Sequence, residues 1–190
     1  MTQPATNSNQ SLPPHLADAD AVTGILGGLE GMLRDLQHVI ASVSLADYSA
    51  ASAGQSSIGA HMRHVLEFIQ VLADSVDTGV VDYESRQHNG IYEREPHAVS
   101  AMLPQLYNKL SQALRQRGAY HPLLLCETAM LGGDKLTVTS SLGREVLFML
   151  QHGVHHLAII KMQAAAMNIS FGPMFGVAVA TQAYREKING

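Results

Sequence analysis

The chain has 190 residues and a formal net charge of -4, so it suits a single domain with a sizeable core and lacks the basic field that would attract nucleic acid. No apolar run approaches the roughly 20 residues that cross a bilayer, and residues 1–20 lack the pattern of a secretory signal, so we expect a cytoplasmic protein without membrane contact. The single cysteine, Cys126, excludes an intrachain disulfide and a cysteine-based zinc site.

The chain begins with a polar stretch, followed by the first candidate helix. Residues 1–16 are rich in Gln, Asn, Ser, Thr and Pro, and we predict a disordered tail there and one folded domain over 17–190. A helix is predicted from Asp18 to about Ser44, because apolar residues recur there every three or four positions. These positions are Val22, Ile25, Leu29, Leu33, Leu36 and Ile40.

Two further helices follow. The small-residue linker 48–57 ends in serines that can cap a helix running to about Val76. After a polar segment, Pro96 opens a helix that runs to about Arg117, where Gly118 provides a stop.

The last third of the chain combines extended and helical patterns. Short apolar runs on both sides of Gly132 and Gly133 predict a β-hairpin. A fourth long helix then extends to about Met167, and Pro173 opens a short C-terminal helix. Four long amphipathic helices predict an all-α fold, an antiparallel four-helix bundle with a small β-hairpin before the fourth long helix.

Three histidines within the apolar fourth helix are the main functional signal. His152 and His156 lie one helical turn apart, and Glu145 falls two turns earlier on the same stripe. His155 lies roughly 60° to 100° away, toward the more solvated side. Glu145 either orients His152 or accepts a proton, or it is a helix-start carboxylate favoured by the helix dipole.

The second helix supplies another inward-facing histidine. His64 lies on its apolar face, and His61 lies roughly 60° away at the edge shared with Glu67. Together with His152 and His156, His64 could coordinate a divalent metal and leave one position open. Histidines four residues apart are also common on solvated helix faces, so the pair of His152 and His156 alone does not establish a metal site. His61 is a spare ligand, a general base or a partner of Glu67.

Four stretches resemble the DinB-like superfamily of bacterial four-helix metalloproteins. They are "SIGAHMRHVLEF", "VDYESR", "SLGREVLFMLQHGVHHLAII" and "FGVAVATQAY", and the resemblance covers roughly Asp18 to Tyr184. In that family one histidine of the second helix and two from an HxxxH motif bind zinc or nickel. Matching these positions implies His64, His152 and His156 as the metal ligands.

The resemblance also implies a chemistry. Relatives include transferases and isomerases that use a low-molecular-weight thiol, so a small-molecule substrate is expected, and the family is often homodimeric. Tyr83 and Arg86, in "VDYESR", are candidate substrate-binding residues, with a surface turn as the alternative. The chain departs from the family's "APST" with "AVAT" at 178–181, in the terminal segment. The competing functional hypothesis is a non-catalytic metal-binding or stress-response interaction module with a structural metal.

Overall fold

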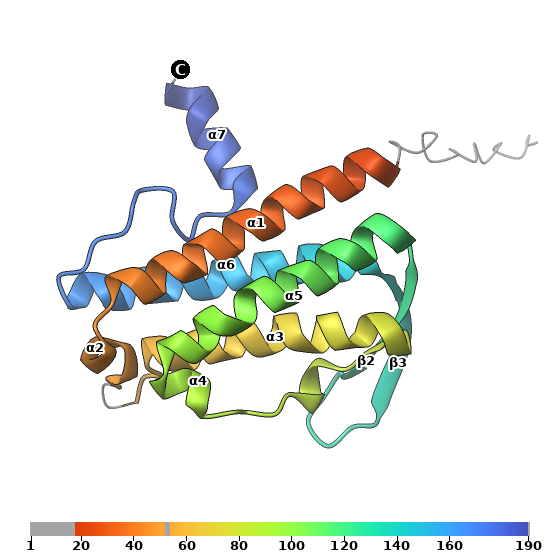
Figure 1. Ribbon diagram of the computed structural model, residues 1–190, viewed down its shortest axis with the longest axis horizontal. Helices are drawn as coiled ribbons and strands as arrows, with labels where there is room; N and C mark the ends of the chain where they lie inside the picture. Colours follow the sequence, from red (N-terminus) through yellow and green to blue (C-terminus); the bar gives the residue numbers. More distant parts are fainter. Residues whose placement is uncertain (1–17, 52–53, 190) are drawn as a thin grey trace, which may run out of the picture.

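The computed structural model describes residues 18–51 and 54–189, and the predicted tail at 1–16 lies outside these residues. The described chain is mostly helical, with a small sheet at one end (Figure 1). Its α-helices are α1 (Asp18–Ser42), α2 (Leu45–Ser49), α3 (Ile58–Thr78), α4 (Ile91–Arg94), α5 (Pro96–Arg117), α6 (Leu142–Ala166) and α7 (Val179–Asn189). The remaining elements are the 3-10 helix η1 (Tyr83–Ser85) and the strands β1 (Val80–Val81), β2 (Pro122–Thr128) and β3 (Lys135–Ser141).

The four long helices lie side by side and enclose the core (Figure 1). Helices α1 and α3 each pack against both α5 and α6. Their apolar stripes face inward, as the sequence periodicity predicts, because burying them removes the largest apolar area from water. Residues that are completely buried come from all four helices and include Leu29, Leu36, Ile69, Leu110 and Val146.

Serine and glycine residues set the helix boundaries near the site. The Ser57 hydroxyl accepts the N–H of Ala60 at 3.0 Å and so caps α3, and the Ser141 hydroxyl caps α6. Gly118 ends α5 with φ 80°, as predicted. These caps fix the position along each axis at which the histidines of α3 and α6 face each other.

The predicted hairpin is confirmed, and a third strand extends it. Strands β2 and β3 pair antiparallel, with Leu125 opposite Val138, and the short β1 pairs parallel to β2, with Val80 opposite Leu124. Strand β1 was not predicted, because a strand of two residues has no periodicity in the sequence. This pairing carries the chain from the end of α3 into η1, which places Tyr83 against Phe68 of α3 and Glu145 of α6.

The C-terminal helix starts later than predicted. Helix α7 begins at Val179 and not at Pro173, because the chain at Gly176 takes φ +66°. A Cβ at Gly176 would meet the backbone nitrogen of Ala158 in α6 at 2.6 Å, so glycine permits a close approach of this loop to α6. Beyond this contact, α7 projects away from the other helices (Figure 1).

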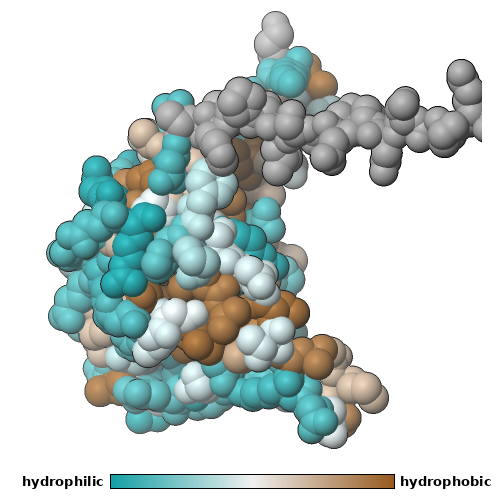
Figure 2. Space-filling view, turned by 90° about the vertical axis from the view of Figure 1, so that its right-hand side faces the viewer, coloured by the Kyte–Doolittle hydropathy of each residue, from teal (hydrophilic) through white to brown (hydrophobic). Residues whose placement is uncertain are grey.

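The surface is polar over most of the face at the sheet end, with an apolar area in its middle (Figure 2). Exposed apolar side chains of the sheet include Val80, Leu124, Leu136 and Val138. In the part of the chain that the structure describes, no helix combines the length and apolar character needed to cross a membrane.

Candidate metal centre

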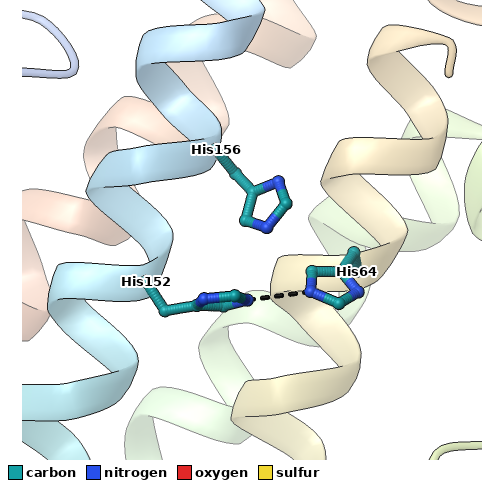
Figure 3. A group of neighbouring side chains, drawn as sticks. All are labelled: His64, His152 and His156. Atoms are coloured by element: carbon teal, nitrogen blue, oxygen red, sulfur yellow. Dashed lines mark hydrogen bonds between the residues drawn. The ribbon is translucent and has the colours of Figure 1, made fainter. Parts of the chain in front are cut away.

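The three predicted ligands lie together between α3 and α6. His64 faces α6 from α3, while His152 and His156 face α3 from successive turns of α6 (Figure 3). One ring nitrogen from each lies within 4.8 Å of the corresponding atoms of the other two, and all three side chains are half-buried. The helical phase read from the sequence therefore predicted this convergence.

The spacing of His64 and His152 fits coordination of a single ion after a small adjustment. Zinc binds imidazole nitrogen at about 2.0 to 2.1 Å, so two tetrahedral nitrogen ligands stand about 3.3 Å apart. The Nε2 atoms of His64 and His152 are 2.8 Å apart, the separation of a hydrogen bond in which one ring donates and the other accepts. Coordination requires both atoms to be unprotonated, and a separation about half an ångström wider accommodates the ion.

Aromatic rings hold the imidazoles in place. The ring of Phe68 stacks on His152 with 4.4 Å between centroids and lies 4.7 Å from His64. Tyr83 also stacks on Phe68, with 4.7 Å between centroids, and Phe148 stacks on His152 at 5.9 Å. These contacts restrict ring rotation, which reduces the entropy that ligand binding would otherwise cost.

The surroundings favour the neutral imidazoles that a metal needs. Burial lowers the pKa of His64 to about 4, helped by the charge of Arg86 and by the neighbouring rings. Burial and the adjacent His64 and His152 lower the pKa of His156 to about 3. Burial also lowers the pKa of His152. At neutral pH all three rings are therefore neutral, and each can present the lone pair of one ring nitrogen.

These shifts predict how the stability of the metal-free protein depends on pH. In the unfolded chain the histidines titrate near their ordinary value of about 6.5, whereas in the folded chain His64 and His156 stay neutral down to about 4 and 3. Below about pH 6.5 the unfolded state binds more protons, so the free energy of unfolding decreases as pH falls toward 4.

Urea unfolding at pH 7.0 and pH 5.0 measures this change. The variant His64→Gln cannot titrate at this position. Its free energy of unfolding should therefore decrease less between pH 7.0 and pH 5.0 than that of the unsubstituted protein. The exposed His97→Gln variant serves as the control and should behave like the parent. An equal decrease in the free energy of unfolding of His64→Gln and His97→Gln between the two pH values would contradict the prediction.

His61 contacts His156, and no hydrogen bond to Glu67 is found among the described residues. Its Nδ1 lies 3.0 Å from Nδ1 of His156, and burial together with the charge of His155 lowers its pKa. With its Nδ1 engaged by His61, His156 directs its other nitrogen toward His64 and His152 (Figure 3). His61 therefore stands where a positioning residue fixes the tautomer of a ligand. His155 is exposed, as predicted from its helical phase.

Glu145 is completely buried at the start of α6 and has three hydrogen-bond donors around it. Its carboxylate accepts the Tyr83 hydroxyl at 3.1 Å, the Arg144 guanidinium at 2.8 Å and the Ser140 hydroxyl. Through Tyr83 and the stacked Phe68 ring, Glu145 supports the wall against which His152 rests. The predicted role of Glu145 in proton transfer stays a prediction.

Arg86 is half-buried beside the imidazoles, at the end of η1. Its guanidinium sits over the ring of Phe68 at 4.9 Å and donates to the backbone oxygen of Tyr83 at 2.7 Å. Burial is the main cause of the lowered pKa of His64 and His152, and the positive charge of Arg86 adds to it. Tyr83 itself is buried, with 3% of its surface exposed, so it faces the protein interior.

The fold and this geometry define a mostly helical protein with a three-histidine group that could hold a metal ion. Comparison of the chain with protein-family models, curated proteins and solved structures found no match in any of the three.

Proposed function

We propose that this chain is a divalent-metal-dependent enzyme of the DinB-like type, an antiparallel four-helix bundle that uses zinc or nickel to activate a low-molecular-weight thiol or water against a small electrophilic substrate. The observation that supports it is the convergence of His64, His152 and His156 from two helices, with all three imidazoles neutral at pH 7. A homodimeric state belongs to the same proposal.

The three histidines would hold the ion through one nitrogen each. A divalent ion in such a site supplies Lewis-acid chemistry, since it lowers the pKa of a thiol or water bound to it. His61 keeps His156 in the required tautomer through the contact between their Nδ1 atoms. Arg86 provides a fixed positive charge over Phe68, beside the ligands, where an anionic group of the substrate can bind.

A thiol-transfer assay tests the proposal. Protein without an affinity tag is loaded with zinc or nickel, and the conjugation of 2-mercaptoethanol to 1-chloro-2,4-dinitrobenzene is followed by absorbance, alongside a panel of other small thiols and of hydrolysable esters. We expect turnover with the loaded protein and background rates with metal-free protein and with His152→Ala. The exposed His155→Ala should keep its activity.

The alternative hypothesis, a non-catalytic metal-binding module, predicts a different result. A metal that only stabilises the fold should raise the melting temperature without supporting turnover of any thiol or ester, and removing His152 should then lower stability in proportion to the lost binding energy. That outcome would favour the non-catalytic metal-binding module.

A further inference from the structure

Helix α7 is attached to its own chain by its polar side. The side-chain amide of Gln182 donates to the backbone oxygen of Val177 at 2.7 Å and to that of Met174 at 3.4 Å. Gln182 is half-buried, whereas residues 179–181 and 183–188 are exposed. Beyond this attachment, α7 projects away from the bundle (Figure 1).

The opposite side of α7 is apolar and faces solvent. Ala180, Tyr184 and Ile188, here called the α7 stripe, recur every four residues, and Tyr184 lies roughly 160° from Gln182 around the helix. Tyr184 and Ile188 keep 63% and 61% of their surfaces exposed. In a single chain such a stripe is expected to face inward, because burial of apolar surface stabilises the fold. The reversed orientation of α7 therefore indicates a partner that covers the stripe.

A surface that suits this stripe lies on α1. Gly24, Gly27 and Gly31, here called the glycine face, lie on the side of α1 away from its buried residues. A Cβ at Gly24 or Gly27 would have no neighbour within 4 Å in the described part of the chain, whereas a Cβ at Gly153 would lie 2.5 Å from the sulfur of Met32. The packing of the single chain therefore does not require Gly24 and Gly27, although glycine weakens a helix interior. Without side chains there, another helix can approach α1 closely.

The two surfaces also match in length and in charge. Helix α7 has 11 residues and is about 16 Å long, which equals the distance along α1 from Asp20 to Gly31. Lys187 follows Ala180 by two turns on the same side of α7, and the exposed Asp20 precedes Gly24 by about one turn. An antiparallel approach brings Lys187 to Asp20 and places opposite ends of the two helix dipoles together.

The α1 that receives the stripe belongs to another molecule. Within one chain, Gln182 and Gly31 line the same cavity of about 400 Å³, so α7 turns its polar side toward its own α1. We propose that two copies of this chain form a dimer in which the α7 stripe of each packs across the glycine face of the other, with Lys187 paired to Asp20 of the second copy. The contact is reciprocal and closes at two chains. It involves no metal, and it rests on the proposed function only for the expectation of a homodimer.

The first test is the mass of the metal-free, full-length protein in analytical ultracentrifugation, expected to be twice the chain mass of 20.4 kDa. Gly27→Gln adds a longer side chain of higher helix propensity where the single chain leaves room. This variant should keep the helical circular-dichroism spectrum and cooperative unfolding of the parent, but its dimer should dissociate about tenfold more readily or more. A monomeric parent, or a Gly27→Gln protein that dimerises as the parent does, would overturn the proposal.

Charge reversal identifies the two helices that meet. Lys187→Glu and Asp20→Lys each place like charges together, and each should weaken the dimer by about tenfold. An equal mixture of the two variants should dimerise with nearly parental affinity, because each α7 then meets the opposite charge on the other chain. Arg185→Glu makes the same change roughly 160° away around α7 and should alter affinity less than about twofold. A mixture that stays monomeric, or an equal loss in Arg185→Glu, would overturn the pairing.

The outcome is separable from that of the proposed function. Metal-dependent turnover by a monomeric parent would support the enzyme and overturn the interface. A parent that dimerises without turnover, and that becomes monomeric on Lys187→Glu, would support the interface and leave the metal chemistry to its own assay. A monomeric parent that binds vesicles of anionic phospholipid would overturn the dimer and assign the α7 stripe to a lipid surface.

Discussion

Replacement of His64 by alanine is expected to abolish stoichiometric binding of zinc and nickel while the fold survives. His64 is the sole member of the three-histidine group on α3, so its loss leaves His152 and His156 on one helix, without the ligand that closes the site from the other side. Loss of an outer contact to a ligand commonly weakens metal binding by 10- to 100-fold, and loss of the ligand itself should cost at least about a hundredfold.

Elemental analysis of protein purified without an affinity tag gives the first measurement. Thermal unfolding gives the second, because zinc at about a hundred times its dissociation constant adds about 2.7 kcal/mol to the folded state. For a chain of this size the melting temperature of the parent should rise by about 5 to 10 °C, and that of His64→Ala should not respond. His155→Ala is the control for surface histidines; a His64→Ala protein with one bound ion per chain would contradict the three-histidine site.

The three-histidine group was predictable because helical phase places each of its members on an inward-facing stripe. His152 and His156 are four residues apart, and His64 lies on the apolar face of its own helix, so rotation per residue alone brings them to the interior. The same rule placed His155 at the surface, where the structure has it. His61 was harder, because at the edge of a face the side-chain rotamer decides whether it meets Glu67 or His156.

The position of the segment from Asp82 to Gln87 could not be predicted in this way. Its path depends on the two-residue strand β1 and its parallel pairing with β2. Such a pairing is long-range and leaves no local pattern in the sequence. The short helices α2 and α4 were missed for a related reason, since tertiary packing stabilises helices of four or five residues more than their own propensity does.

Replacement of Glu145 by alanine is expected to lower the free energy of unfolding by about 2 to 4 kcal/mol. The substitution leaves the Tyr83 hydroxyl without its hydrogen-bond acceptor in a residue that is only 3% exposed. It also removes the acceptor of the Ser140 hydroxyl. Burial, and then the charge of Glu145, raises the pKa of Tyr83, so this hydroxyl stays protonated and needs an acceptor. Urea unfolding of the metal-free protein measures the loss.

A double substitution separates this structural role from a catalytic one. Tyr83→Phe removes the hydroxyl that lacks an acceptor. The double variant Tyr83→Phe with Glu145→Ala should therefore lose less free energy of unfolding than the two single variants lose together, by about 1 kcal/mol or more. If Glu145 serves only in proton transfer, Glu145→Ala should keep nearly the parental free energy of unfolding, and the losses of the two single variants should add in the double variant. Tyr83 stacks on Phe68, and Phe68 stacks on His152. Loss of the acceptor for the Tyr83 hydroxyl should therefore also make the position of the His152 ring less fixed, so that zinc affinity falls together with stability.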